Sequence, residues 1–312
     1  MIRYNCVVIN VNFKGIRETS LTAGNVLLVY VDVTGPAREL ERSHLCGPAA
    51  GLVQAEALAC VSLLGSEISR NNETVTLRFR VSGPIAGILV ENAAGGGLRG
   101  YTHKKVLNDL DTMQSVNDIK TLGEFGELSV VRSIPGKTLS SSMINVRPAY
   151  LASGLRGYYT EALQRTVELE LVAHSTVDGV EYARVLLIEC MPDGDKRSYN
   201  KLCRKIAGGV VAGRLQKPCG IKELCELLEI GDYDIKKTEP LMFKCRCSAE
   251  RVERMVNALP DEDIKEMIHG EKSTRIVCHM CGETYKINKE ALWSILEKRG
   301  HDMDLGVDFN CD

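Results

Sequence analysis

The sequence predicts an α+β fold: an N-terminal domain of mixed sheet and helix, a helical linker and a small C-terminal domain. The chain has 312 residues, which suggests two domains on length alone. Up to about residue 191, strand-like and helix-like segments follow one another without the regular β-α-β order of a parallel sheet. The C-terminal part carries two close pairs of cysteines. We therefore treat the two ends of the chain separately.

The composition is that of an ordinary globular protein, with 44% hydrophobic and 26% charged residues. The formal net charge of −2 gives no electrostatic reason to expect a nucleic acid or an anionic membrane as partner. No apolar run approaches the roughly eighteen residues of a membrane span, and the first residues lack the pattern of a signal peptide. We expect a cytoplasmic protein whose thiols are reduced.

The N-terminal domain is expected to span residues 1–191 and to contain several strands and two helices. Alternating or β-branched segments predict strands over Arg3–Val11, Val26–Val33, Glu73–Val81, Ile85–Val90, Leu98–His103 and Gly126–Arg132. Apolar residues at three- and four-residue steps predict helices over Ala49–Leu64 and Pro148–Leu163. The segment Thr166–Cys190 is expected to form a hairpin that turns at Asp178-Gly179.

Glycines 95, 97 and 100 satisfy the pattern G-x-G-x-x-G, which can mark a dinucleotide site. That function requires a helix to begin at the glycines, so that its N-terminus faces the pyrophosphate. Here Leu98–Thr102 has the pattern of a returning strand. A plain hairpin is the better interpretation.

Residues 192–240 are expected to form a helical linker of marginal stability. Met191–Asp195 contains Pro, Gly and two Asp, a composition typical of a turn between domains. The helical pieces that follow, up to Glu239 and including Ile221–Ile230, are interrupted by glycines and Pro218. In a helix interior, Gly lowers helix stability by about 1 kcal/mol relative to Ala and Pro by about 3 kcal/mol.

Two thiol pairs in residues 241–299 predict a zinc site formed by Cys245, Cys247, Cys278 and Cys281. The first pair is spaced i and i+2, so on an extended chain both sulfurs lie on one side. The second pair encloses two residues and precedes Gly282, where a tight knuckle favours a residue without Cβ. Four thiolates leave no position for water, so one structural Zn²⁺ per chain is expected. A redox dithiol and two structural disulfides remain alternatives.

The pairs lie among short elements. Ser248 and Asn288 are placed to cap helices that begin at Ala249 and Lys289. A third helix is expected between Pro260 and Gly270, and short strands over Arg275–Val277 and Tyr285–Ile287 flank the second pair. Residues 300–312 are expected to be disordered.

Several motifs resemble those of the heat shock protein 33 family of redox-regulated chaperones. The specific motifs are Cys245–Ser248, Ala258–Asp263 and Cys278–Tyr285, and looser similarity extends upstream through Ser82–Ile88, Arg99–Tyr101, Gly126–Val131 and Leu187–Pro192. The segments before Gly24 and around Tyr159–Arg165 depart from the family pattern.

The resemblance implies an ATP-independent holdase that is inactive when reduced and zinc-bound. Oxidation would join Cys245 to Cys247 and Cys278 to Cys281, release zinc, unfold the linker and expose a surface for unfolded or partly folded client proteins. A homodimer of the oxidised form is left open. Three cysteines of the predicted linker, Cys203, Cys219 and Cys225, could divert this oxidation into other disulfides. The other cysteines outside the site are Cys6, Cys46, Cys60, Cys190 and Cys311.

Two other functions remain as alternatives. Cys46 precedes the helix at Ala49 and follows His44 by two residues, and a helix N-terminus can lower a thiol pKa, so a cysteine-dependent enzyme is conceivable. No third group to orient the histidine is identifiable, and we expect no enzyme. A constitutive zinc module that binds a macromolecule is supported by Arg246, Arg251, Arg254 and nearby lysines, but acidic neighbours argue against a phosphate-binding face. His279 is expected to be solvated rather than a ligand.

Overall fold

The structure is a computed structural model that describes residues 14–112, 118–270 and 274–299. The chain divides into two compact units after Cys245, called here the larger unit and the smaller unit. The strand predicted over Arg3–Val11 and the tail predicted over 300–312 lie outside the described residues. The linker predicted over residues 192–240 is defined by its separate unfolding, so its boundaries at 191 and 240 stay predictions.

The larger unit is built on one ten-stranded sheet with the strand order β7-β6-β3-β4-β5-β10-β1-β2-β9-β8. Neighbouring strands are antiparallel except β10 and β5, which are parallel. The strands are β1 Gly15–Thr22, β2 Val26–Asp32, β3 Thr74–Val81, β4 Gly87–Ala93, β5 Gly97–Thr102, β6 Gly126–Ile134, β7 Lys137–Val146, β8 Thr166–Thr176, β9 Gly179–Cys190 and β10 Tyr233–Phe243. With its helices this sheet gives the predicted α+β fold.

Helix α2 (Pro48–Leu64) is the centre of the larger unit's main core. Its alanines and Gly51 are buried together with its larger apolar residues, so the helix lies close to the strands. The Pro48–Glu67 segment is long and apolar enough to cross a membrane, which the sequence analysis had not expected, but 94% of its most apolar window is buried inside the protein. Its burial marks it as a core helix that packs on this sheet.

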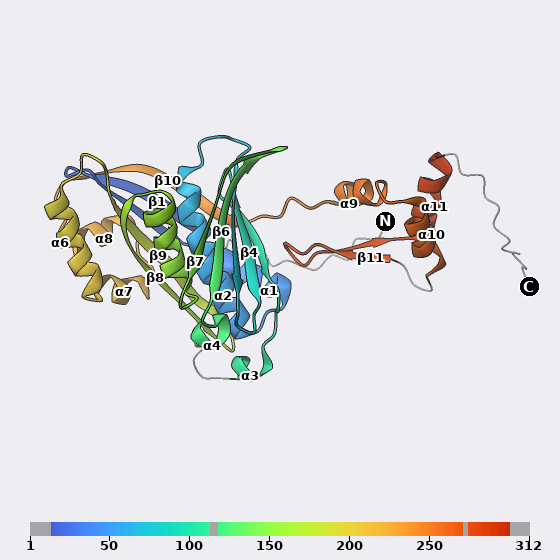
Figure 1. The fold of residues 1–312 in the computed structure, drawn as a ribbon, viewed down its shortest axis with the longest axis horizontal. Coiled ribbons are helices and arrows are strands. Elements are labelled where there is room, and N and C mark those ends of the chain that lie inside the picture. The colour runs from blue at the N-terminus through green and yellow to red at the C-terminus, as the bar shows by residue number, and fades with distance from the viewer. Residues whose placement is uncertain (1–13, 113–117, 271–273, 300–312) are drawn as a thin grey trace, which may run out of the picture. The chain divides into compact units, whose positions relative to one another are not determined.

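A second apolar layer covers part of the sheet. Helices α6 (Lys196–Ala207), α7 (Val210–Leu215) and α8 (Ile221–Leu227) lie together at one end of the larger unit (Figure 1). They form a cluster separate from the main core, in which Val26, Leu28, Tyr30, Leu186 and Ile188 come from strands β2 and β9. The predicted linker therefore packs on the sheet.

The expectation of helix up to Glu239 was wrong over its last part. Tyr233–Phe243 is strand β10, which pairs with β1 along its length and with β5 through only Met242 and Phe243. Lys236 and Lys237 interrupt the apolar pattern, and β10 is mostly exposed, so the sequence carried no strong strand periodicity here. Pairing with β1, more than 200 residues away, decides the conformation.

Most other predicted elements are confirmed, including the hairpins β4–β5 and β8–β9, which also confirms a hairpin at the G-x-G-x-x-G sequence. Strands β1 and β7 were missed, and so was α1 (Thr34–His44), which directly follows the strand predicted over Val26–Val33. The helix predicted over Pro148–Leu163 is α5 (Leu151–Gly157) followed by a π-helical turn, Tyr158–Ala162. Short helices α3 (Asn108–Asp111) and α4 (Asp118–Leu122) complete this unit, with a 3-10 turn at Gly65–Glu67.

The smaller unit contains α9 (Ala249–Val256), α10 (Asp261–His269), the hairpin β11 (Thr274–Val277) and β12 (Thr284–Ile287), and α11 (Lys289–Lys298). Ser248 and Asn288 cap α9 and α11 as predicted, because their side chains accept hydrogen bonds from the Arg251 and Ala291 amides. The buried core is small and consists of Val256, Ile264, Ile268, Leu292, Ile295 and Leu296. So little apolar area is insufficient to hold such a unit alone.

Candidate metal centre

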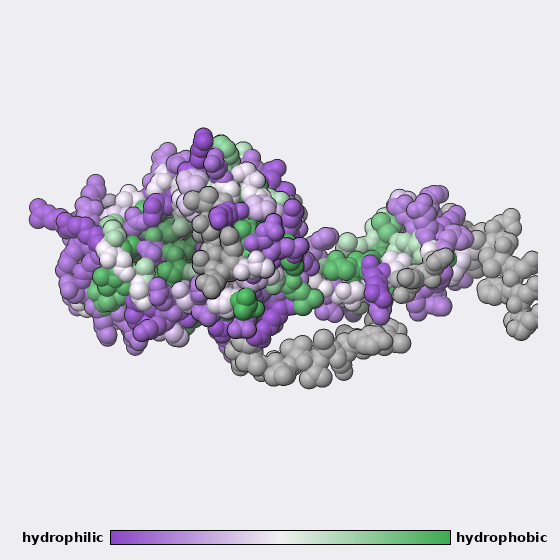
Figure 2. Space-filling view, turned by 90° about the horizontal axis from the view of Figure 1, so that it is seen from below, coloured by the Kyte–Doolittle hydropathy of each residue, from purple (hydrophilic) through white to green (hydrophobic). Residues whose placement is uncertain are grey.

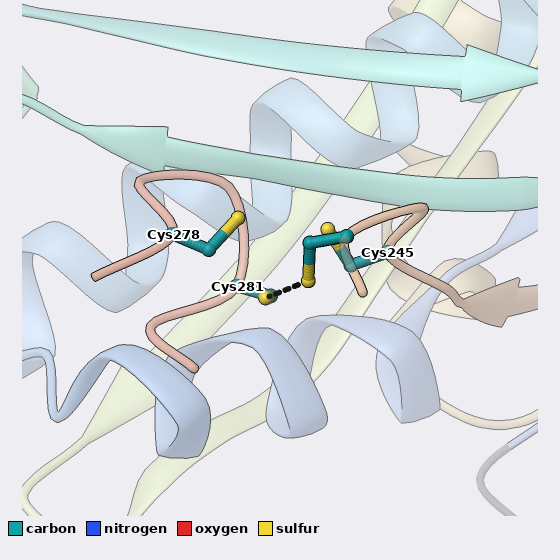
Figure 3. Close-up of side chains that lie close together, drawn as sticks. Cys245, Cys278 and Cys281 are labelled. Atoms are coloured by element: carbon teal, nitrogen blue, oxygen red, sulfur yellow. Dashed lines mark hydrogen bonds between the residues drawn. The ribbon is translucent and has the colours of Figure 1, made fainter. Parts of the chain in front are cut away.

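The four predicted cysteines converge. The sulfur atoms of Cys245, Cys247, Cys278 and Cys281 all lie within 4.8 Å of one another. Figure 3 shows the labelled side chains of Cys245, Cys278 and Cys281 pointing toward a common centre. Within the described ranges, this is the one group of three or more potential metal ligands so placed.

Local backbone geometry explains how the second pair is presented. Cys278 and Cys281 occupy the turn between β11 and β12, where the Gly282 amide donates to the Cys278 carbonyl at 2.8 Å. The Cys278 amide in turn donates to the Glu283 carbonyl at 2.9 Å. Gly282 has a φ of 73°, in the left-handed region that favours glycine, which confirms the predicted knuckle.

The sulfur positions fit a tetrahedral metal. With metal–sulfur bonds of about 2.3 Å, four thiolates around Zn²⁺ lie about 3.8 Å apart. The contact between the Cys247 and Cys281 sulfurs measures 3.3 Å. That separation is far longer than the roughly 2.05 Å of a disulfide. The group can hold a metal ion, and soft sulfur ligands in this number favour zinc among common ions.

Two side chains outside the predicted set donate to the sulfurs. The Tyr285 hydroxyl lies 3.0 Å from the Cys247 sulfur, and the Arg99 guanidinium lies 3.8 Å from the Cys245 sulfur. Burial first, and then the bond to Cys247, raise the pKa of Tyr285, so the phenol remains a donor. Arg99 is held by an ion pair with Glu91 on β4. Donors of this kind stabilise negative charge on sulfur.

Sequence reasoning missed both donors. Tyr285 could have been found, because an aromatic with a hydroxyl follows the second pair at the start of a strand. Arg99 is 146 residues from Cys245 in the chain. The two meet because Lys244 continues from β10 beside β5, its amide donating to the Leu98 carbonyl at 2.8 Å.

The remaining candidates are placed as follows. His279 is exposed and is not among the converging ligands. Cys46 lies just before α2, but burial raises its pKa to about 11, opposite to what a nucleophilic thiol requires. The His44 ring bonds through Nε2 to the Gly100 carbonyl at 2.9 Å. Arg246, Arg251 and Arg254 do lie around one surface hollow of the smaller unit.

This fold and thiol cluster define a class: an α+β protein with a cluster of four cysteines in its C-terminal part. The sequence model described as Hsp33 protein matches residues 16–288, and the chain belongs to the Hsp33 family. It is 27% identical over 272 residues to the 33 kDa chaperonin of Geobacter sulfurreducens, covering 86% of this chain and 90% of that protein. It is 25% identical over 271 residues to the 33 kDa chaperonin of Lactiplantibacillus plantarum, covering 86% and 92%.

A solved structure shows the same fold. The 33 kDa chaperonin of Thermotoga maritima, titled a heat shock protein 33 homolog, superimposes with a TM-score of 0.80 at 19% identity. The match covers 93% of this chain and all of that one.

Proposed function

We propose that this protein is a redox-regulated, ATP-independent holdase, inactive when reduced and activated by oxidation of the four cysteines. The observation that carries the proposal is the convergence of four cysteine sulfurs within 4.8 Å in a member of the Hsp33 family. Unfolded or partly folded proteins are its partners. The working compartment is a reducing cytoplasm, in which the thiols begin reduced.

Cys245, Cys247, Cys278 and Cys281 would hold one zinc ion per chain. When bound, zinc supplies folding free energy, on the order of 10–16 kcal/mol in small structural sites, and keeps the four sulfurs as thiolates. The smaller unit needs that contribution, because the buried apolar cluster among its described residues is small, with six members. Tyr285 and Arg99 direct their donors at two of these sulfurs.

Oxidation turns the four cysteine thiolates, which can bind zinc, into disulfides, which cannot. Each disulfide forms when two thiols lose two electrons and two protons to an oxidant such as peroxide, which is reduced to water. The resemblance to the family assigns the pairs Cys245–Cys247 and Cys278–Cys281. With the sulfurs joined, the metal is released and the smaller unit loses most of its stability.

The chain connects this event to the sheet. Cys245 follows β10 by two residues, and β10 joins β5 through only two residue pairs. The Arg99–Cys245 contact and the bond from the Lys244 amide to Leu98 secure this end of β10. When Cys245 enters a disulfide, Arg99 keeps its ion pair with Glu91 but loses the Cys245 thiolate as a partner, and the end of β10 is free to separate. Residues 192–240, which precede this point, would then unfold.

The surface so uncovered is the sheet face beneath α6–α8. Nine of the fourteen buried residues in that cluster lie between Tyr199 and Leu228, and five belong to β2 and β9. The face of the larger unit seen in Figure 2 is mainly hydrophilic, with apolar patches between the polar residues. Detachment of these helices would expose a contiguous apolar face to solvent. Such faces bind unfolding chains without sequence preference.

The test follows zinc release with a chromophoric chelator while peroxide is added at mild heat. The same samples are assayed for suppression of aggregation of an unfolding client. We expect about one zinc per chain to leave as protection appears, and a thiol reductant to reverse both. Zinc that stays bound, or leaves without any gain in protection, contradicts the proposal.

A Cys46→Ala variant is the matched control in this assay. Because the Cys46 thiol is largely buried and its pKa is raised, the holdase mechanism requires nothing of it. Protection should be unchanged. Loss of protection in a variant that still binds zinc would favour the cysteine-dependent alternative.

A further inference from the structure

Two cysteines outside the metal centre lie in the same interface, where α6 packs on the sheet. Cys190 is the last residue of β9 and pairs with Val26 on β2 and Thr166 on β8. Cys203 lies in the third turn of α6. Both are free and partly buried, and both pack against the apolar cluster beneath α6–α8.

Chain periodicity points both thiols into this interface. On α6, Tyr199, Leu202, Cys203 and Ile206 are spaced i, i+3, i+4 and i+7, so they share one helix face. Tyr199, Leu202 and Ile206 are buried against the sheet. On β9, Leu186, Ile188 and Cys190 alternate along the strand and share the sheet face that contacts α6.

Tyr199 is the common neighbour of the two thiols. Burial, the hydrogen bond to Cys203 and the nearby Cys190 all raise the pKa of the Tyr199 hydroxyl. Burial likewise raises the pKa of Cys203, while the Tyr199 bond opposes the rise and Cys190 adds to it. Each thiol therefore lies within electrostatic range of the same groups.

The turn between β9 and α6 brings the helix back onto the end of its own strand. A Cβ added to Gly194 would lie 3.1 Å from the Cys190 sulfur, so glycine lets the turn pass close to that thiol. The helix begins at once, because the Asp195 side chain accepts from the Arg197 and Ser198 amides. The end of β9, the turn and the start of α6 thus form one compact strand–turn–helix unit.

We propose that Cys190 and Cys203 are a second oxidisable thiol pair, and that their disulfide fixes α6 to the sheet. The Cys190 thiolate attacks peroxide, the O–O bond breaks, and a sulfenic acid and hydroxide form. The Cys203 thiol then attacks the sulfenic sulfur, the S–S bond forms and the S–O bond breaks, and the thiol proton passes to the departing oxygen, which leaves as water. Two electrons pass from the thiols to peroxide.

The consequence for regulation rests on the proposed function. The linker residues are expected to unfold after oxidation, and the new disulfide would exclude α6 from that unfolding. Closing a loop of this length restricts the open chain and lowers the population in which α6 is detached by on the order of a hundredfold. Under strong oxidation the second pair would therefore keep α6 packed on the sheet, so that part of the apolar face stays covered and client binding is limited.

The first experiment maps disulfides in the full-length, zinc-loaded chain after graded peroxide treatment. Thiols are blocked, and tryptic peptides are analysed without reduction. We expect peptide 185–196 joined to peptide 202–204, with a mass lower by two hydrogens than the sum. Trypsin leaves Cys219 and Cys225 on other peptides, so each competing bridge has its own mass. Bridges from Cys203 to another thiol, or no Cys190 bridge once the zinc-site thiols are oxidised, would overturn the proposal.

The second experiment measures hydrogen exchange of α6 amides in the oxidised wild-type, Cys203→Ser, Cys190→Ser and Cys219→Ser proteins. Serine at position 203 retains a hydroxyl that can bond to Tyr199, which protects folding. We expect both Cys203→Ser and Cys190→Ser to exchange on the order of a hundredfold faster in α6 than wild type and the Cys219→Ser control. Equal α6 exchange rates in all four proteins would contradict the proposed effect of the disulfide. Neither readout depends on zinc release or client protection, so failure here is distinct from failure of the holdase proposal.

Discussion

The two units of this protein are stabilised by different means. In the larger unit a sheet of ten strands and the buried helix α2 enclose an extensive apolar core. The smaller unit has a buried cluster of six apolar residues and three of the four converging thiols, and the fourth thiol, Cys245, is the last residue of the larger unit. The main core of the larger unit is held by apolar burial, whereas the thiols of the cluster are groups that an oxidant can modify. Under the proposed function, the larger unit is the durable scaffold and the thiol cluster is the oxidation-sensitive trigger.

The largest effect is expected from breaking the thiol cluster. A Cys278→Ser variant should lose its metal, because three thiolates and a serine bind zinc poorly, and the smaller unit should unfold. Limited trypsin digestion should then remove residues after Lys244 and leave the sheet intact. Cys219→Ser, which changes a thiol of the larger unit, is the control and should keep its metal. A resistant smaller unit in metal-free Cys278→Ser would contradict this account.

The next largest effect concerns a buried ion pair of the larger unit. Arg17 is 2% exposed and donates to Glu239 on β10 at 2.8 Å, to the Ser62 carbonyl and to Asn92. Glu239→Gln leaves a buried guanidinium without its counter-charge and should cost about 3–5 kcal/mol in urea unfolding. The double variant Arg17→Met/Glu239→Met should recover much of that loss. If it is no more stable than Glu239→Gln, the charge argument fails.

The same pair predicts a pH dependence. Burial raises the pKa of Glu239, but hydrogen bonds and charge from Lys237 and Arg17 outweigh it, and the net pKa is lowered. A carboxyl with a lowered folded pKa stabilises the fold above its unfolded pKa of about 4.3 and loses that contribution as pH falls through the folded value. Wild type should therefore lose more stability than the double variant when urea unfolding is repeated at decreasing pH below about 4.

A pair of core substitutions compares the two units directly. Leu58 is fully buried in α2 and Ile264 is fully buried in α10. Each change to Ala should cost about 2–5 kcal/mol through lost burial and a cavity. Only Ile264→Ala should weaken metal binding, measured by competition with a chelator, because only that unit couples folding to the metal. Equal metal affinity in the two variants would show that the packing of the smaller unit is not coupled to metal binding.

The smallest effect should come from Tyr285→Phe. The change removes the donor 3.0 Å from the Cys247 sulfur and preserves the ring. Loss of a supporting hydrogen bond to a ligand typically lowers metal affinity by about tenfold or more. Chelator competition measures the loss, with Tyr182→Phe in β9 as the matched control. Unchanged affinity would show that the hydroxyl only fills space beside the thiols.

Local patterns in the sequence were sufficient for much of this description. The spacing of the cysteines, followed by Gly282, predicted a metal cluster, because ligands and turn are encoded within a few residues. Helix α2 and the β4–β5 hairpin were equally accessible from periodicity and glycine placement. Strand β10 was not, since its exposed, lysine-containing segment becomes a strand only through pairing with β1.

The sequence by itself determined the α+β class, the four converging thiols and the small helices around them, because each follows from short-range chemistry. Only the tertiary structure decided that the predicted linker packs on the sheet, that β10 joins the sheet's two halves, and that Arg99 reaches Cys245. These contacts join residues far apart in the chain, and their free energy comes from burial and pairing that no local pattern records.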